Sequence, residues 1–516
     1  FIGMTITELQ QQYSAHPNMA VMKRLLKDTS VQTVFCGGLC ASAASLFSSV
    51  LVQEGGCPFV FILGDLEEAG YFYHDLTQIL GTERVLFFPS SFRRSIKYGQ
   101  KDAANEILRT EVLSRLQKGE EGLCIVTYPD ALAEKVVSRK ELSNKTLKLN
   151  VGEKVDTTFI TDVLHSYGFE YVDYVYEPGQ YAVRGSIIDV FSFASEYPYR
   201  IDFFGDEVES VRTFEVESQL SREKKDGVSI VPDLAVTGDV TTSFLDFIPK
   251  ETTLAMRDFL WLRERIQVVH DEALTPQAIA VQEAEENGGI TLEGKLIDGS
   301  EFTVRALDFR RLEFGNKPTG TPNASVTFNT SAQPIFHKNF DLVASSFKDY
   351  LEKGYSLYIC SDSMKQTDRI KAIFEDRGDK INFTPVERTI HEGFVDNTLR
   401  LCIFTDHQLF DRFHKYNLKS DKARSGKVAL SLKELNQFTP GDYVVHTDHG
   451  IGRFSGLVRI PNGDTTQEVL KLVFQNEDVV FVSIHSLHKV SKYKGKEGEA
   501  PRLNKLGTGA WEKLKE

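Results

Sequence analysis

The chain has 516 residues, of which 41% are hydrophobic and 26% are charged, and its formal net charge is −13. A chain of this length is too long for one hydrophobic core, so we expect several globular domains, and no apolar run reaches the roughly 18 residues that span a bilayer. The acidic balance argues against extensive contact with DNA, so we expect protein partners and at most weak or indirect DNA binding.

The first predicted unit covers residues 4–141 and alternates strands with helices. Apolar runs predict strands at residues 31–36, 58–63, 84–88 and 123–127, and helical spacing predicts helices at 65–80, 104–116 and 129–136. Continuous apolar strands separated by helices are typical of a parallel sheet that is covered on both faces. We therefore predict an α/β domain here.

The second predicted unit covers residues 142–232 and has a different pattern. One helix is expected at residues 158–167, with strands at 171–176, 180–183, 186–191, 199–204 and 208–214 and a charged loop at 223–226. Several short strands with a single helix indicate an α+β domain inserted into the α/β architecture.

Mixed α/β signals return over residues 233–337, which we interpret as the second part of the first domain. Within them, residues 315–331 are rich in Gly, Pro, Asn and Thr, and we predict a loop or linker. A further small α/β domain is predicted at residues 339–418, with helices at 342–353 and 362–375 and strands at 356–360 and 399–404.

Residues 436–494 alternate apolar and polar positions, and glycines interrupt the alternation. This pattern predicts about five short antiparallel strands in a small, strongly bent β-barrel. Residues 495–516 resemble a linker followed by the start of a helix, so we expect more protein to follow.

Six cysteines are scattered along the chain, mostly in apolar surroundings. Their spacing predicts neither a disulfide framework nor a metal site, and buried free thiols are typical of a reducing cytoplasm. We therefore expect a cytoplasmic protein with no membrane association.

A glycine-rich turn follows the first predicted strand and includes Gly37 and Gly38. Such a turn can hold phosphates on backbone amides, but a working loop ends in Gly-Lys-Ser/Thr. Here Ala43 and Ala44 precede Ser45, so the lysine that would neutralise the phosphates is missing. We predict a structural turn that binds no nucleotide.

Four histidines in the β module, His446, His449, His485 and His488, could suggest zinc. Residues three apart on a strand point to opposite faces, and no cysteine or well-placed carboxylate accompanies them. We therefore predict no metal site. No nucleophile–base pair stands out either, so we predict no catalytic residue.

The stretch around Arg184 admits two interpretations, a hairpin with surface charges or a partner-binding face. Arginine and aromatic side chains dominate interface hot spots, and Tyr181 and Phe191 flank Arg184 in sequence. By themselves, the residues favour a multidomain binding protein without catalytic machinery.

Two blocks of sequence carry a resemblance to a known family. EPGQYAVRGSIIDVF (177–191) and YPYRIDFFGDEVESVRTFEVESQ (197–219) resemble the repair protein UvrB and, more closely, the bacterial transcription-repair coupling factors (Mfd). VVHTDHGIGRFSGL (444–457), with KLGTGAW (505–511), resembles the RNA-polymerase-interacting domain of that family, which CarD-type regulators share. The order of the units is also that of the coupling factors.

The resemblance implies a UvrB-like parallel-sheet domain with a degenerate nucleotide site, interrupted by a UvrA-binding domain, and a Tudor-like or CarD-like barrel after the small α/β domain. The aromatic hairpin with which UvrB clamps DNA is not expected, because residues 92–100 are too few and lack its tyrosine-rich sequence. The motor domains of the family, with their ATP and Mg²⁺, would lie beyond residue 516. The chain would thus be a non-enzymatic adaptor without a cofactor.

By the same resemblance, Arg184 matches an arginine on the UvrA-binding face, with Tyr181 and Phe191 beside it; Ala182 stands where UvrB has a second arginine. Val458, Arg459 and Ile460 are the expected contacts with the RNA polymerase β subunit, on a strand that could pair with an edge of the partner. The alternatives are a UvrB-type ATP-dependent helicase and a CarD-like regulator with unrelated N-terminal domains.

Overall fold

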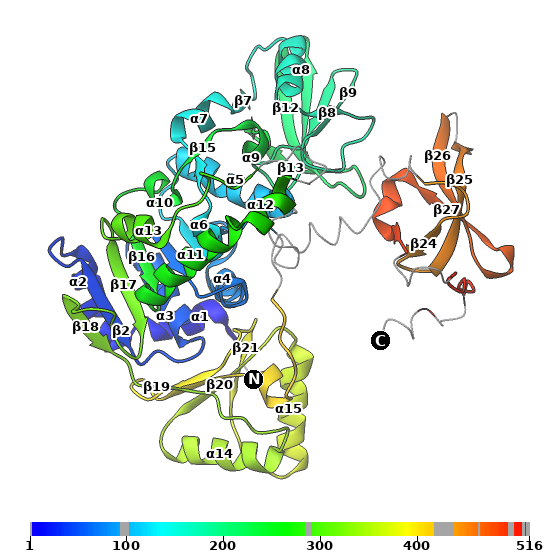
Figure 1. Cartoon of the computed structure of the whole chain (residues 1–516). Coiled ribbons are helices and arrows are strands. Elements are labelled where there is room, and N and C mark those ends of the chain that lie inside the picture. Colours follow the sequence, from blue (N-terminus) through cyan, green and yellow to red (C-terminus); the bar gives the residue numbers. More distant parts are fainter. Residues whose placement is uncertain are drawn as a thin grey trace. The chain divides into compact units, whose positions relative to one another are not determined.

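The computed structural model describes residues 3–92, 103–283, 291–416, 438–462, 465–493, 500–507 and 511. Two units are distinguished: residues 1–142 with 238–418, and residues 143–237 with 419–516 (Figure 1). None of the described helices is long and apolar enough to cross a membrane.

A seven-stranded sheet is the core of the first unit, and all of its neighbouring strands are parallel. Its order is β18-β2-β17-β16-β3-β5-β4. The strands are β2 (Thr33–Gly37), β3 (Phe59–Ile62), β4 (Val85–Phe87), β5 (Cys124–Thr127), β16 (Thr253–Met256), β17 (Arg310–Gly315) and β18 (Ala324–Thr327). Segments on both sides of the inserted domain therefore build one sheet, whose central strands are apolar because both faces are covered.

Helices pack on this sheet in two groups, one containing α1, α3 and α4 and the other α6, α11 and α13 (Figure 1). The helices are α1 (Ile6–Tyr13), α2 (Pro17–Lys27), α3 (Ala43–Glu54), α4 (Leu66–Leu80), α5 (Ala103–Gln117), α6 (Pro129–Ala133), α10 (Phe244–Phe247), α11 (Phe259–Ala273), α12 (Pro276–Glu283) and α13 (Gly299–Ala306). Helix α4 begins where the sequence predicted, because the Asp65 carboxylate accepts the N–H of Glu68 and satisfies an otherwise unpaired donor of the first turn.

A second, six-stranded sheet has the order β1-β21-β20-β23-β22-β19 and belongs to the same unit. Its elements are β1 (Met4–Thr5), β19 (Thr330–Ala332), β20 (Ser356–Ser361), β21 (Thr384–Glu387), β22 (Phe394–Asp396) and β23 (Leu401–Thr405), with α14 (Phe340–Glu352), α15 (Met364–Asp376) and α16 (Asp406–Leu409). Buried Phe347, Phe374 and Phe404 form the centre of its core.

Two predictions were wrong in this unit. Met4 was placed in the first α/β domain, yet it pairs with Val386 in the second sheet. Residues 315–331 were predicted as a loop, yet they contain β18 and part of β19. Both are polar edge strands, and an edge strand that buries only one side chain in its length, as β18 buries Val326, does not produce an apolar run.

The inserted domain is an α+β unit, as predicted. Strand β6 (Val136–Val137) and helix α7 (Arg139–Asn144) precede it, and β15 (Val240–Thr242), which pairs antiparallel with β6, follows it. Its six-stranded sheet has the order β13-β12-β11-β10-β9-β8, and β14 pairs with β7. The elements are β7 (Leu147–Asn150), α8 (Thr157–Ser166), β8 (Glu170–Tyr171), β9 (Gln180–Arg184), β10 (Ile187–Val190), β11 (Tyr199–Phe204), β12 (Glu207–Phe214), β13 (Ser221–Lys225), β14 (Gly227–Ile230) and α9 (Leu234–Thr237).

The charged segment at residues 223–226, predicted as a loop, lies largely in the edge strand β13. All five residues of β13 are exposed. Charged side chains on an edge strand prevent its pairing with other chains, so the charge that suggested a loop has a role in the sheet. The predicted strand at 171–176 is shorter than expected and ends at Tyr171.

The C-terminal sheet has five antiparallel strands in the order β27-β26-β25-β24-β28. They are β24 (Tyr443–His446), β25 (Gly450–Asn462), β26 (Thr465–Val473), β27 (Val479–Ser483) and β28 (Val490–Lys492), with 3₁₀ turns η1 (Gln475–Glu477) and η2 (Ile484–Lys489). Val444, Phe454 and Leu470 lie in its small core. The antiparallel strands are confirmed, but β27 and β28 remain edges among the described strands, because η2 intervenes between them, so no closed barrel is formed there.

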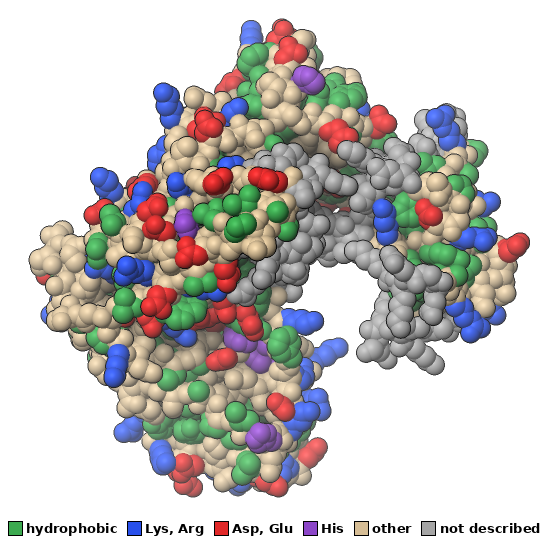
Figure 2. All heavy atoms as spheres, in the orientation of Figure 1, with side chains coloured by type: hydrophobic (Ala, Val, Ile, Leu, Met, Phe, Trp, Pro, Cys, Tyr) green, Lys and Arg blue, Asp and Glu red, His purple; other side chains and the backbone are tan. Residues whose placement is uncertain are grey.

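Charged side chains of both signs are interspersed over the face shown in Figure 2. They form no continuous basic surface over the described part of that face. This distribution agrees with the acidic net charge and does not favour an extended DNA track.

Candidate functional site

The glycine-rich turn between β2 and α3 is occupied by the chain's own backbone. Gly38 has φ 84°, and a Cβ at this position would lie 1.9 Å from the carbonyl oxygen of Phe328. The N–H of Phe328 donates to the carbonyl of Gly37 at 2.8 Å. The glycine is therefore needed for a close approach between two segments of the protein, whether or not a ligand binds.

Amides of this turn that would otherwise face a phosphate have internal partners. The N–H of Cys40 donates to Oγ1 of Thr330 at 2.9 Å, and the N–H of Ser42 donates to the carbonyl of Glu392 at 3.2 Å. The hydroxyl of Ser45, the position that would hold Mg²⁺ in a working loop, donates to buried Asp75 at 2.7 Å. These groups are thus engaged in holding the two sheets of the unit together.

A cavity of about 300 Å³ lies beside the turn, and carboxylates dominate its polar lining. The lining carboxylates are Asp65, Glu67, Glu68, Asp75 and Glu392. Arg257 also lines the cavity, but its Nη1 is already paired with Glu68 at 3.0 Å. Burial raises the pKa of Asp75 to about 6, so even this carboxyl is mostly charged at neutral pH. Such a lining repels nucleotide phosphates.

Residues 92–100, where the DNA-clamping hairpin was not expected, lie outside the described residues apart from Phe92. The Phe92 ring packs against a small core cluster that includes Ala273 and Leu296. The prediction about the hairpin therefore stays a prediction.

Arg184 lies at the end of β9 with its side chain 39% exposed. Its guanidinium pairs with Asp189, donates to the carbonyl of Asp173 at 3.0 Å and lies over the ring of Tyr174. The Asp189 side chain is fully buried and also accepts Nε of Arg200 at 2.9 Å. Two arginines thus share one buried carboxylate, and Arg184 is held in place while part of it remains available to a partner.

The register of the sheet places further cations beside this pair. Asp189 lies opposite Arg200, Arg200 opposite Arg212, and Arg212 opposite Lys224. Neighbouring residues on a strand alternate between faces, so the core positions Ile188, Ile201 and Val211 point to the other side. One sheet face therefore carries Arg184, Arg200, Arg212 and Lys224, which we call the basic face. The basic face was not predictable from the sequence, because Arg212 and Lys224 lie far from Arg184 along the chain.

Tyr181 and Phe191, predicted as UvrA contacts, lie in the core instead. Their exposed fractions are 7% and 5%, so neither ring is available to a partner in this structure. The ring of Tyr181 packs edge-to-face on Tyr171 at 5.4 Å, and Tyr171 is 60% exposed. Aromatic character by itself did not distinguish the ring that reaches the surface from the ring that supports it.

Val458, Arg459 and Ile460 lie in the second half of the long strand β25 and pair with β26. The preceding strand, β24, pairs only with residues 450–453 of β25, so the other edge of residues 458–460 has no partner strand among the described strands. A β-bulge between Phe454 and Leu457, where Gly456 has φ 108°, separates the two halves. The predicted residues therefore lie on an open backbone edge, with Arg459 exposed.

The rings of His446 and His449 lie closer together than the sequence predicted. We expected residues three apart to diverge, but the rings of His446 and His449 lie 4.6 Å apart. The strand ends at His446 and a turn follows, so the alternation of a strand does not extend to His449. The side chains of His485 and His488 lie outside the described residues.

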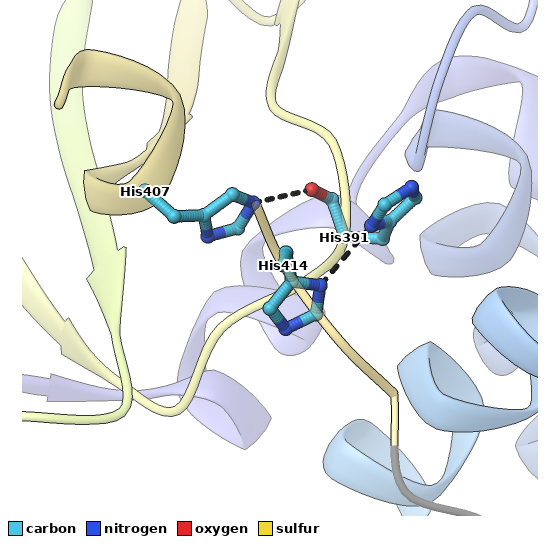
Figure 3. A group of neighbouring side chains, drawn as sticks. All are labelled: His391, His407 and His414. Carbon is cyan, nitrogen blue, oxygen red and sulfur yellow. Dashed lines mark hydrogen bonds between the residues drawn. The ribbon is translucent and has the colours of Figure 1, made fainter. Parts of the chain in front are cut away.

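A different histidine group was missed by sequence reasoning. His391, His407 and His414 offer ring nitrogens that all lie within 4.8 Å of one another (Figure 3). They come from separate loops and a short helix, with no spacing typical of a metal motif. Contacts between their side chains bring them together: the rings of His407 and His414 stack with centroids 4.4 Å apart, and Nδ1 of His391 lies 3.1 Å from Nδ1 of His414.

Two domains of the chain match models of known protein families. The model of the UvrB interaction domain matches residues 147–235, and the model of the CarD-like/TRCF RID domain matches residues 438–494. The transcription-repair-coupling factors of Staphylococcus aureus (strain bovine RF122 / ET3-1) and Bacillus subtilis (strain 168) are each 23% identical over 93% of this chain. The chain covers 46% of each of these relatives, which is less than half their length. The resemblance to the transcription-repair coupling factors is therefore confirmed over nearly the whole chain.

Proposed function

We propose that this chain is the docking portion of a transcription-repair coupling factor. In this proposal it binds the β subunit of a stalled RNA polymerase and recruits UvrA, which starts nucleotide excision repair in the cytoplasm. The observation that carries the proposal is that two docking domains of different kinds, a UvrB interaction domain and a CarD-like/TRCF RID domain, occur on one chain.

The UvrA contact is assigned to the basic face of the inserted domain. Arg184 is its proposed anchor, because the guanidinium is positioned by Asp189 and still partly exposed. Arginine in such a setting is a frequent hot spot. Tyr181 and Phe191 take part by supporting the sheet from within.

The polymerase contact is assigned to the open edge of β25. A strand of the β subunit would pair with the backbone of Val458, Arg459 and Ile460 and so extend this sheet. Main-chain hydrogen bonds would provide affinity, and side chains would provide selectivity. The second exposed edge, β27, is the alternative surface on the same sheet, and its Phe481 is 51% exposed.

We further propose that the chain has no ATPase activity and touches DNA weakly or indirectly. The engaged amides and the acidic cavity around Gly37, Gly38 and Ser45 support this. ATP and Mg²⁺ would act only in motor domains outside this sequence. The helicase alternative therefore requires a nucleotide site elsewhere, and the CarD-like alternative requires that UvrA does not bind.

A bridging experiment tests the proposal. The chain is immobilised and exposed to UvrA, to the RNA polymerase β subunit, and to both together, and ATP hydrolysis is measured in parallel. We expect each partner to bind alone, both to bind simultaneously, and hydrolysis to stay at background. Polymerase binding without UvrA would favour the CarD-like regulator, and hydrolysis above background would favour the helicase.

A further inference from the structure

The three histidines of Figure 3 lie where the second sheet meets α3 and α4 of the first. His391 lies between β21 and β22, His407 is in α16, and His414 lies beyond the end of α16. All three belong to the same unit. Their convergence is therefore a property of one compact part of the molecule.

The backbone around the group is held by contacts that do not involve the rings. The N–H of His391 donates to Asp75 at 2.8 Å, and the next N–H, of Glu392, donates to Ser42 at 3.0 Å. On the other side, the Tyr71 hydroxyl donates to the carbonyl of His414 at 2.9 Å. The rings are thus presented from fixed positions.

Packing on α4 fixes the segment that carries His414. The Tyr416 ring lies against Gly70, where a Cβ would come within 2.4 Å of it. The Tyr71 ring stacks on His391, with the ring centroids 3.4 Å apart. A glycine inside a helix is unfavourable by itself, so its presence here agrees with a need for this close approach.

The interatomic distances define which groups each ring nitrogen faces. Nε2 of His407 lies 2.6 Å from the carbonyl oxygen of His391, and its Nδ1 lies 3.7 Å from the Asp406 carboxylate. Nδ1 of His391 and Nδ1 of His414 lie 3.1 Å apart, and Nε2 of His391 lies 3.5 Å from the Glu392 carboxylate. A carboxylate or carbonyl on one ring nitrogen is the usual outer partner of a histidine whose other nitrogen binds a metal.

The surroundings of His391 and His414 favour their neutral form, which is the form that binds metals. Burial, followed by the neighbouring His407 and His74, lowers the pKa of His391 to about 4. Burial and the same neighbours lower the pKa of His414 to about 3. The carboxylates of Asp406 and Glu392 lie at the edges of the group, where they would offset the charge of a cation.

His74 adds a fourth ring next to this group. It projects from α4, its ring centroid lies 5.1 Å from that of His414, and its Nε2 is buried without a hydrogen-bond partner among the described residues. A buried nitrogen without a partner is costly, so it calls for an explanation such as an ion.

We propose that His391, His407 and His414 bind one zinc ion, with His74 as the fourth ligand. Zn–N distances of about 2.0–2.1 Å in a tetrahedron place ligand nitrogens about 3.3 Å apart, and the three nitrogens of His391, His407 and His414 already lie within 4.8 Å of one another. Imidazole nitrogens suit zinc, and a closed set of four protein ligands is typical of a structural site. The ion would fasten the segment around His414 to α4 and join the two sheets.

The test uses the whole chain, purified without a histidine tag and stripped of metal. Zinc content is measured after equilibration with Zn²⁺, Co²⁺ is used as a spectroscopic probe, and thermal unfolding is followed with and without Zn²⁺. We expect one ion per chain, the visible absorption of tetrahedral Co²⁺ and a higher unfolding temperature with zinc. No bound ion at micromolar Zn²⁺ would overturn the proposal and leave a stacked histidine cluster only.

Substitutions locate the site. His414→Ala is the primary variant, because it changes a loop position and leaves the His407 hydrogen bond intact; His391→Ala is the second. Loss of an outer partner of a metal ligand typically weakens metal binding by about 10–100-fold, and loss of a ligand itself should weaken zinc binding by more than that. His165→Ala, an exposed position on α8, is the matched control and should bind normally.

Two further outcomes would contradict the assignment. If His446→Ala removes the ion and His414→Ala does not, zinc binds the C-terminal sheet and the proposal is wrong. If His74→Ala leaves both affinity and the Co²⁺ spectrum unchanged, His74 is not a ligand. Circular dichroism of each variant distinguishes loss of a ligand from loss of the fold.

Discussion

Asp189 shows, at the scale of single residues, how a buried charge can organise an exposed surface. Its carboxylate is fully buried, and two guanidiniums, of Arg184 and Arg200, satisfy it. Arg200 is held further by the carbonyl of Gln219 and by the ring of Phe214. Arg200 is thus the structural partner, whereas the more exposed Arg184 is free to add contacts outside the domain.

Arg184→Ala should therefore weaken UvrA binding while the domain stays folded. Because Arg200 still pairs with Asp189, no buried charge is left alone, and we expect a loss of roughly 1–3 kcal/mol in binding free energy. Isothermal titration calorimetry measures it, with Lys148→Ala, an exposed cation on β7, as the control. Unchanged affinity would remove Arg184 from the interface.

Asp189→Asn, unlike Arg184→Ala, should strongly reduce the stability of the inserted domain. The substitution leaves two guanidiniums around a neutral amide, and breaking a buried pair in this way typically costs about 3–5 kcal/mol. The free energy of unfolding in urea would show it. Asp202→Asn, on the neighbouring strand β11 and more accessible to solvent, is the comparison. Equal effects of the two substitutions would mean that Asp189 has no special structural role.

Glu134 should make the first unit less stable as pH rises. Its buried carboxylate accepts the Ser91 N–H at 3.1 Å and lies 3.9 Å from Arg109. Burial, only partly offset by Arg109, raises its pKa above 4.5. The folded state therefore binds this proton more tightly than the unfolded state does. The resulting stabilisation is complete below the unfolded pKa and is lost as pH rises through the folded pKa.

The glutamine in Glu134→Gln cannot titrate. The free energy of unfolding of this variant should therefore rise relative to that of the parent chain as pH increases from about 4.5 to neutrality. Urea unfolding at a series of pH values measures the difference. Glu54→Gln, which changes a carboxylate at the surface, is the control. A constant difference across this range would show that Glu134 has the same affinity for its proton in both states.

At the scale of elements, the sheets differ in how their edges are protected. In the inserted domain, the edge strand β13 is charged and exposed along its length. In the C-terminal sheet, the second half of β25 has an open edge, and β27 exposes Val479 and Phe481. Unprotected edges invite pairing with another chain, so this sheet is the one suited to strand addition.

Ile460→Arg should abolish binding of the polymerase β subunit. Ile460 lies on the open half of β25, and an added charge there would have to be desolvated on docking. Phe481→Arg, on the opposite edge strand β27, is the matched control and should bind normally. Pull-down with the β subunit compares them. If Phe481→Arg is the variant that loses binding, the interface lies on β27.

At the scale of the whole molecule, the two domains that match family models share a chain with a seven-stranded and a six-stranded sheet, both covered by helices. The inserted domain interrupts the seven-stranded sheet, and the C-terminal sheet follows the last strand of the six-stranded sheet. Among the described strands, neither of these two domains supplies a strand to the other's sheet. The two contacts should therefore be separable.

Separability predicts a crossed pattern of binding. Arg184→Ala should keep full affinity for the polymerase β subunit, and Ile460→Arg should keep full affinity for UvrA, because the residues lie in different sheets. Parallel titrations of both variants with both partners provide the measurement. A single substitution that weakens both contacts would argue against two independent sites.

Much of the architecture was predictable, because the parallel strands β3 and β5 are buried along their whole length and consist almost entirely of apolar residues, and because α4 begins with its own capping residue. Polar edge strands were not predicted, because they bury few side chains. Strand β18 buries one side chain and β13 buries none, so neither has a pattern that differs from a loop. Strand β1 is too short, and its partner β21 too distant in sequence, for any local signal.

The sequence by itself determined the order of the domains and the loss of the phosphate-binding lysine, because both depend on local patterns and motif spacing. The tertiary structure alone decided that Tyr181 and Phe191 are buried while Arg184 is exposed, and that four cations share one sheet face. It alone brought His391, His407 and His414 together. Burial and side-chain convergence depend on contacts between distant segments, and no local pattern of residues encodes those contacts.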